Sequence, residues 1–178
     1  MLAAALAAAA GQPFTELAGE QILGPLEMGA IAFTFTPQTQ PRAAVGYHPR
    51  RSPMRRLLLR WVIGEPAGRW VALRPFLVDG PAYGGPVGPA EELARFLQLH
   101  LRDGELDGTR LLGPQATAAM RQISVDGRRY DLGLGWFRPA SQRDADPPFV
   151  EHLGGGAGFF NLIRIYPPAA WASPSWAT

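Results

Sequence analysis

Residues 148–167, PFVEHLGGGAGFFNLIRIYP, contain the pattern that decides the predicted fold. Two runs, PFVEHLGG and FFNLIRIYP, are rich in aromatic, leucine and isoleucine residues and meet across glycines, which is typical of two neighbouring strands. Upstream, RYDLGLGWF at residues 129–137 predicts a third strand. The C-terminal third of the chain is therefore expected to form a sheet.

Two helical patterns precede these strands. Residues 84–106, GGPVGPAEELARFLQLHLRDGEL, predict a helix from about Pro89 to Arg102, with two glutamates near its positive end. Its apolar face comprises Leu93, Phe96, Leu97 and Leu101. A second helix is predicted from Pro114. Strands that follow helices in this way predict an α+β protein in which an antiparallel sheet packs against helices.

The first part of the chain is also expected to be helical. Residues 1–12, MLAAALAAAAGQ, predict an alanine-rich helix ending at Gly11 rather than a signal peptide, because no basic residue precedes the apolar run. Another helix is predicted between Pro13 and Gly24. Residues 31–35, IAFTF, alternate like a short strand, and residues 57–63, LLLRWVI, form an apolar run of undetermined type that we expect to be buried.

Composition limits the functions that the chain can have. With 178 residues, 47% of them hydrophobic, the chain is long enough for one domain with a core. It has no cysteine, which excludes disulfides, a thiolate nucleophile and a cysteine metal site. Its three histidines, His48, His100 and His152, are too scattered to predict a metal site, and we expect no cofactor. No apolar run is long enough to span a bilayer, so we expect a soluble protein, cytoplasmic as given, with no membrane partner.

Five arginines form a basic cluster between residues 50 and 60: Arg50, Arg51, Arg55, Arg56 and Arg60. Such a cluster could contact nucleic-acid phosphates. However, the net charge is only +2, and no aromatic residues alternate with the arginines to stack on bases. We therefore expect a solvated loop and no nucleic-acid partner.

The glycine run at residues 154–158 has two interpretations. It is not a phosphate-binding loop, because the chain contains no lysine and the run leads into a strand rather than a helix. Local sequence favours a glycine hairpin or bulge between two strands. The alternative is the wall of an active site, for which the adjacent His152 is a candidate, although an isolated histidine is commonly structural.

Four stretches in order carry a resemblance to a known family: GQPFTELAGEQILGPLEM (11–28), PAYGGPVGPAEELARFLQLHLRDGELDGTRLL (81–112), YDLGLGWF (130–137) and EHLGGGAGFFNLIRIYP (151–167). Together they resemble the serine beta-lactamase and penicillin-binding-protein-like hydrolases, in the class C branch that includes esterases and D-amino-acid peptidases. The resemblance extends over most of residues 11–167.

The resemblance implies a beta-lactamase/transpeptidase-like fold, an antiparallel sheet flanked by helices beside a helical subdomain, of which this chain would hold a part. The family builds its active site from Ser-x-x-Lys, Tyr-x-Asn and a Lys/His-x-Gly motif on a strand. Here His152-Leu153-Gly154 is similar to the third motif, and Gly155 falls where the family directs a backbone N–H at the oxyanion. The resemblance thus implies a catalytic site of His152, Gly154 and Gly155, with Leu153 and Gly156 binding substrate. One oxyanion donor is worth roughly a hundredfold to a thousandfold in rate.

The other two motifs are missing. Ser-x-x-Lys requires a lysine, and none of the four tyrosines is followed at the second position by asparagine. No Gly-x-Ser-x-Gly sequence supplies another nucleophile. Residues 1–167 are therefore interpreted as the C-terminal part of a serine hydrolase, inactive alone, whose substrate would be a small amide or ester and whose partner would be an N-terminal half. The alternative is a non-catalytic binding or structural domain that retains the cleft.

Residues 168–178 form an atypical tail, PAAWASPSWAT, where the resemblance implies a glycine-containing apolar strand. Regrouping the codons across this tail yields such a strand, which suggests a frameshift near Pro168; a native tail on the surface is the alternative. If the last strand is lost in this way, FFNLIRIY is expected to be an exposed sheet edge, which promotes aggregation.

Overall fold

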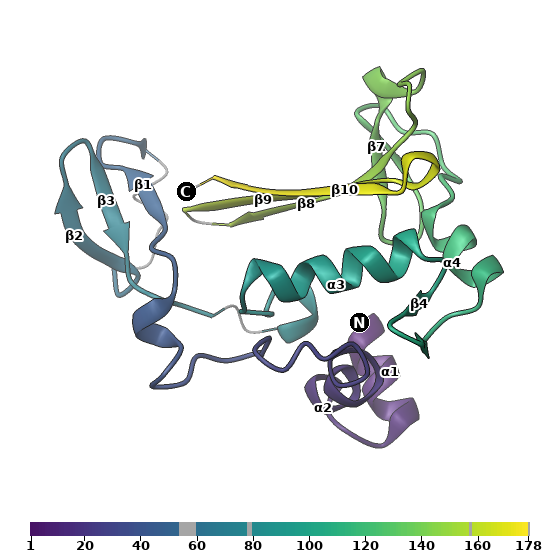
Figure 1. Ribbon diagram of the computed structural model, residues 1–178. Helices are drawn as coiled ribbons and strands as arrows, with labels where there is room; N and C mark the ends of the chain where they lie inside the picture. The colour runs from purple at the N-terminus through teal and green to yellow at the C-terminus, as the bar shows by residue number, and fades with distance from the viewer. Residues whose placement is uncertain (54–59, 78–79, 157, 178) are drawn as a thin grey trace.

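The main sheet occupies the C-terminal third of the chain, as the sequence predicts. The computed structural model describes residues 1–53, 60–77, 80–156 and 158–177. Five antiparallel strands follow one another in the order β10-β9-β8-β7-β6 (Figure 1). They are β6 (Tyr130–Leu132), β7 (Phe137–Pro139), β8 (Val150–Gly156), β9 (Phe159–Tyr166) and β10 (Trp171–Ala177). The stretch RYDLGLGWF, which predicts one strand, supplies both β6 and the start of β7.

Helices precede the sheet, and one of them covers it. The helices are α1 (Leu2–Ala10), α2 (Phe14–Ala18), α3 (Ala90–Leu101) and α4 (Pro114–Arg121). Short helical turns are η1 (Gly19–Leu23), η2 (Gln40–Arg42), η4 (Pro81–Tyr83), η5 (Ala140–Gln142) and η6 (Pro167–Ala169). In Figure 1, α3 runs along one face of the sheet, where it contacts β9 and β10. The predicted α+β architecture and the helices from Pro89 and Pro114 are confirmed.

Helix α3 contributes to two hydrophobic clusters. Leu97 packs with Trp136, Val150 and Ile165 of the main sheet region. On another side of the helix, Leu99 packs with Leu26, Met28 and Leu106. These eight residues are nearly or fully buried, so α3 joins the sheet to the segment that follows α2.

Polar contacts fasten the same segment to α3. The Glu92 carboxylate accepts hydrogen bonds from the backbone N–H groups of Ala30 (2.9 Å) and Ile31 (3.1 Å). One helical turn later, Arg95 donates to the carbonyl of Leu26 and pairs with Asp107 at 2.9 Å. The apolar face of the helix sets the packing, and these two charged residues fix the position of residues 26–31.

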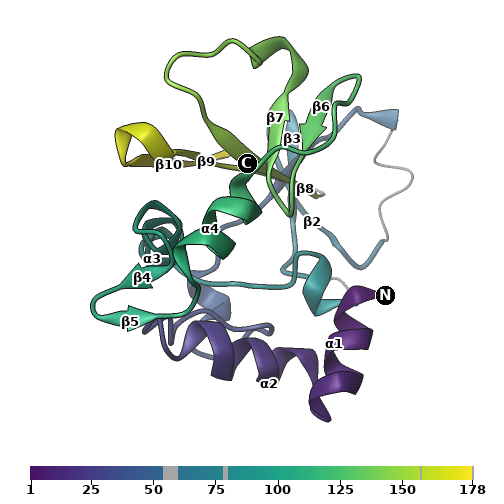
Figure 2. The ribbon, with the colours of Figure 1, turned by 90° about the vertical axis from the view of Figure 1, so that its right-hand side faces the viewer.

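A smaller sheet lies at the tip of the β8–β9 hairpin. Its strands are β1 (Tyr47–Pro49), β2 (Ile63–Ala67) and β3 (Trp70–Leu73), in the order β1-β3-β2. The approach is close, because a β-carbon placed on Gly46 would lie 2.5 Å from the Phe159 ring, and one on Gly158 would lie 2.6 Å from Leu73. The remaining strands, β4 (Glu105–Leu106) and β5 (Thr109–Arg110), form a hairpin after α3 (Figure 2).

Three sequence expectations need correction. Residues 31–35 form no strand; Ala32 makes only an isolated bridge with Val87, because the carboxylate of Glu92 takes the neighbouring N–H groups. Within residues 57–63, positions 57–59 lie outside the described residues, Val62 is buried as expected, and Trp61 is 55% exposed. The predicted exposed edge at FFNLIRIY is wrong, because residues 171–177 pair with β9 along its length and make it an internal strand.

Helix α1 differs from the other helices in that none of its residues is buried. It ends as predicted at Gly11, whose φ of 68° lies in the left-handed region that terminates helices. No helix in the part of the chain that the structure describes has the length and apolar character needed to cross a membrane.

Candidate active-site strand

Strand β8 carries all five sequence-predicted site residues. Its antiparallel register with β9 pairs His152 with Ile163 and Gly154 with Asn161. Because side chains alternate along a strand, His152, Gly154 and Gly156 share the face on which Val150 packs against α3. Leu153 and Gly155 belong to the opposite face. Leu153 can therefore contribute only its backbone to the face that carries His152.

The three glycines at 154–156 are not required by the fold of this chain. None has a positive φ, and all three lie in regular register with β9. A β-carbon on Gly155 or Gly156 would meet nothing within 4 Å, and one on Gly154 would only touch Asn161 at 3.7 Å. Glycine weakens strands, and glycine without a local reason is typical of a strand that a ligand or another backbone approaches closely.

The turn glycine Gly158 is different. Its φ is 77°, and an added β-carbon would lie 2.9 Å from the Tyr47 nitrogen as well as against Leu73. The local interpretation as a glycine hairpin therefore applies to Gly158 but does not account for Gly154, Gly155 and Gly156.

This contrast predicts opposite effects of two alanine substitutions. Gly155→Ala should change the free energy of unfolding by no more than about 1 kcal/mol, and in the stabilising direction, because the residue fits its extended backbone. Gly158→Ala should destabilise the chain by more than about 1 kcal/mol through backbone strain and steric overlap. Urea unfolding followed by circular dichroism measures both. An equal loss at the two positions would show that the β8 glycines are structural.

His152 is exposed and is held through its ring. The imidazole stacks on Phe137 with ring centroids 4.8 Å apart and an interplanar angle of 26°. Neither ring nitrogen makes a hydrogen bond within the described residues. The stack fixes the plane of the ring while its nitrogens stay available to a ligand. Phe137 is thus a neighbour of the candidate site that sequence reasoning missed.

The hairpin that supplies Phe137 is fixed by a buried ionic cluster. The fully buried carboxylate of Asp131 accepts hydrogen bonds from Arg138 (2.9 Å), Arg143 (2.5 and 2.8 Å) and the backbone N–H of Gly127 (3.0 Å). The hydrogen bonds from Arg143, aided by those from Gly127 and Arg138, hold the pKa of Asp131 well below its ordinary value. Asp131 thus remains charged and anchors β6 to β7, which carries Phe137.

The opposite face of β8 has its own ion pair. Glu151 is only 3% exposed and accepts two hydrogen bonds from Arg164 of β9, at 2.6 and 2.9 Å. The Arg164 guanidinium lies 4.0 Å from the centroid of the Phe149 ring. Because these charges satisfy each other, they are structural, and neither lies on the face of His152.

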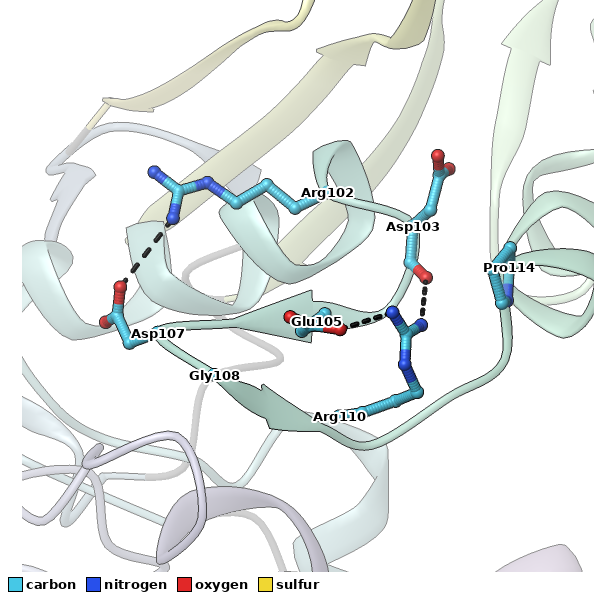
Figure 3. A pocket seen from close by; sticks show the side chains of 7 residues that line it. All are labelled: Arg102, Asp103, Glu105, Asp107, Gly108, Arg110 and Pro114. Carbon is cyan, nitrogen blue, oxygen red and sulfur yellow. Dashed lines mark hydrogen bonds and ion pairs between the residues drawn. The ribbon is translucent and has the colours of Figure 1, made fainter.

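A hollow at the β4–β5 hairpin is another, weaker candidate. Its lining residues are Arg102, Asp103, Glu105, Asp107, Gly108, Arg110 and Pro114 (Figure 3). Arg110 pairs with Glu105 and donates to the Asp103 carbonyl at 3.3 Å, while Arg102 pairs with Asp107 at 3.6 Å. Each charge thus has a partner. Within the described ranges, no group of three or more acidic or histidine side chains is placed to hold a metal ion.

Comparison with known proteins adds an independent line of evidence. The family model described as Beta-lactamase matches residues 1–170. D-alanyl-D-alanine-carboxypeptidase/endopeptidase AmpH of Escherichia coli strain K12 is 28% identical over 175 residues, covering 94% of this chain and 40% of AmpH. Penicillin-binding protein 4 of Amycolatopsis lactamdurans is 33% identical over 112 residues, covering 58% of this chain and 27% of that protein.

Solved structures share the fold. The octameric penicillin-binding protein homologue from Pyrococcus abyssi superposes with a TM-score of 0.68 at 17% identity, covering 94% of this chain and 34% of that one. The beta-lactamase/D-alanine carboxypeptidase from Pseudomonas syringae gives 0.66 at 14% identity, covering 93% and 48%. This chain therefore spans less than half the length of each of these relatives.

Proposed function

This chain belongs to the beta-lactamase family, and from that premise we propose that it is the C-terminal part of a serine hydrolase that cleaves a small amide or ester. In this proposal β8 is the strand beside which the acyl group lies. His152 contacts the substrate on one face, and the backbone of Gly154 and Gly155 approaches the reacting carbonyl, with Gly156 and the backbone of Leu153 extending the binding surface.

The observation that carries the proposal is the open glycine strip beside an exposed, oriented histidine. A tetrahedral oxyanion must come within about 3 Å of a backbone N–H, which a bulky side chain on the strand would obstruct. Neither φ nor packing demands glycine at 154–156. Glycine at these three positions therefore fits a strand whose backbone a ligand approaches closely.

Acyl transfer in this family needs an activated serine nucleophile, and this chain has no Ser-x-x-Lys motif to provide one. The family's serine and tyrosine motifs have no counterpart in the sequence, and without a lysine no Ser-x-x-Lys pair can form. Activation of a serine requires an adjacent base. We therefore propose that the chain is inactive alone and that an N-terminal segment carrying those motifs completes the site. Carboxypeptidase activity, named for AmpH, is one candidate for the completed enzyme.

Covalent labelling tests the absence of a nucleophile. The chain should show no mass increase after incubation with a fluorescent penicillin or a fluorophosphonate, because neither reagent meets an activated serine. Intact-protein mass spectrometry provides the readout. Stoichiometric labelling of any hydroxyl in the isolated chain would overturn the proposal.

A complementation experiment tests whether an N-terminal segment completes the site. Mixing with the N-terminal part of a family member that carries Ser-x-x-Lys and Tyr-x-Asn should restore labelling on the added segment. The variant Gly155→Trp serves as its control, because a bulky side chain on the strand should prevent restoration. Labelling of the mixture that is indifferent to this variant would exclude the glycine strip as the acyl-binding wall.

A non-catalytic binding domain is the second candidate. It is favoured by the same combination of an open strip and a missing nucleophile. Binding of an amide to the strip without any restoration of labelling would support it over the hydrolase.

A further inference from the structure

The small sheet and the segments beside it hold the excess positive charge of the chain. Residues 45–77 contain seven arginines and one acidic residue, Glu65, whereas the remaining residues contain ten arginines and fourteen acidic residues. In Figure 1 this sheet forms one end of the molecule, at the tip of the β8–β9 hairpin. The net charge of +2 thus combines a basic end with an acidic remainder, and such asymmetry is typical of chains that contact a polyanionic surface.

Strand β3 has one buried and one exposed face. Val71 and Leu73 are only 3% and 4% exposed. Trp70 lies in register between Pro49 of β1 and Ala67 of β2, and all three of these residues are exposed. Because successive side chains alternate along a strand, the outer face of the small sheet carries an indole ring at this end.

Two arginines lie next to Trp70 in the small sheet. The guanidinium of Arg69 lies over the indole, 5.2 Å from the ring centroid. The backbone N–H of Arg50 donates to the Arg69 carbonyl at 2.9 Å, so both arginines belong to the same end of β3. A cation over an aromatic ring makes this end of the sheet basic and apolar at once.

A second tryptophan is exposed at the other end of β3. Trp61 is 55% exposed and follows Arg60, which is exposed as well. The backbone N–H of Arg74 donates to the Val62 carbonyl at 2.8 Å, which fixes Arg74 beside this turn. Trp70 and Arg74 are about 13 Å apart along an extended chain, so the two groups lie at opposite ends of one small sheet.

Acidic side chains do not neutralise these arginines within the part of the chain that the structure describes. Four of them are exposed and form no ion pair there: Arg51, Arg60, Arg69 and Arg74. In the main body of the protein, by contrast, Arg95 and Arg121 each pair with an aspartate at 2.9 Å. The small sheet therefore presents positive charge to an anionic partner.

A lipid surface fits these residues better than a nucleic acid. Single strands stack their bases on aromatic rings, whereas Arg69 lies over the Trp70 ring. Indole rings and arginines are stable together at the boundary between lipid headgroups and hydrocarbon. Val45 and Leu77, which flank the sheet in the sequence, are also exposed and add apolar contacts. The sequence predicts no membrane partner because no run can span a bilayer, but a surface contact needs no such run.

We propose that the small sheet is a docking surface for an anionic lipid bilayer. The arginines bind headgroup phosphates, and Trp61 and Trp70 place their rings at the depth of the headgroups. None of these residues belongs to β8, so the docking surface is independent of the proposed function.

Flotation with lipid vesicles tests this surface on the whole chain. Vesicles of phosphatidylcholine and phosphatidylglycerol, about two to one, should carry the chain with them, vesicles of phosphatidylcholine alone should not, and added salt should weaken the binding. The double variant Arg69→Gln/Arg74→Gln should bind about 10- to 30-fold more weakly, since each arginine near an anionic surface contributes roughly fivefold. Its matched control is Arg128→Gln/Arg129→Gln, which removes the same charge from exposed positions outside the small sheet and should stay within about twofold of the wild type.

A pair of tryptophan variants tests the contact of the rings with lipid. Trp61→Ala should lower the affinity for the mixed vesicles at least about threefold, because an exposed apolar ring loses its burial in the bilayer. Trp171→Ala removes a ring of similar exposure, 54%, from the main sheet and should leave the affinity unchanged. In the wild type, brominated lipid in the mixed vesicles should quench part of the tryptophan fluorescence.

Equal binding to both kinds of vesicle, or equal losses in the two double variants, would overturn the proposal. An affinity that is unchanged in Trp61→Ala would do the same. Tighter binding to a single-stranded oligonucleotide than to the mixed vesicles at the same salt concentration would identify a nucleic-acid surface instead. Circular dichroism checks that each variant is folded, and the quenching of the wild type decides the question if a variant is not.

Discussion

Replacement of Leu97 by alanine is expected to lower the free energy of unfolding by about 2–5 kcal/mol. Leu97 is 1% exposed and packs against Trp136, Val150 and Ile165, which come from three parts of the sheet region. The loss combines removed apolar burial with the cavity left between α3 and the sheet. Since domains are stable by about 5–15 kcal/mol, this single change should remove a large part of the total.

Urea unfolding monitored by tryptophan fluorescence and circular dichroism checks this value. Leu134→Ala is the matched control, because Leu134 is 65% exposed and its truncation should cost no more than about 0.5 kcal/mol. A loss below about 1 kcal/mol for Leu97→Ala would mean that the α3–sheet contact is not what holds the two parts together.

Acidification should destabilise the chain through His100. This imidazole is fully buried between Phe96 and Trp136, and neither ring nitrogen has a hydrogen-bond partner among the residues that the structure describes. Burial lowers its pKa from 6.5 to about 4, and the positive charge of Arg121 adds to the shift. The unfolded chain therefore binds a proton more readily than the folded chain, and stability that is complete above pH 6.5 falls toward pH 4, by up to about 3 kcal/mol.

Free energies of unfolding measured between pH 4 and 7 test this effect. His100→Phe should remove the His100 contribution, so that the remaining slope is shallower than that of the wild type. Leu134→Ala, a change at an exposed side chain that does not titrate, should retain the wild-type slope. If His100→Phe perturbs the fold, the C2–H resonance of His100 in the wild type reports its titration directly, and a midpoint near 6.5 would contradict the buried neutral state.

Elements with strong periodic patterns were predictable from the sequence. Helix α3 begins and ends within one residue of the predicted range, since its apolar stripe and the flanking Pro89 specify it locally. The strands around the glycine run were predicted for similar reasons. The strand predicted at residues 31–35 is wrong, because its alternating pattern is local. The backbone N–H groups of Ala30 and Ile31, at the start of this stretch, are instead bound by Glu92, which lies 62 and 61 residues away.

The candidate site was predictable only in part. His152 and its glycines stand next to each other in the sequence, so a short motif reveals them. Phe137 lies beside His152 because β7 pairs with β8, and no short sequence motif records such pairing. Sequence analysis did not predict that residues 171–177 form a strand. Its residues pair with β9 through backbone groups, which depend little on side-chain type, and the frameshift near Pro168 stays a prediction that sequencing of the coding DNA tests.

Helix α1 buries none of its nine residues, so its stability depends mainly on its own backbone hydrogen bonds. Isolated helices of this length are marginal in water. Its amide protons should therefore exchange with deuterium by local fraying, long before those of α3, whose protection reflects opening of the whole domain. The same fraying should leave the rest of the protein folded, because no residue of α1 belongs to its buried core.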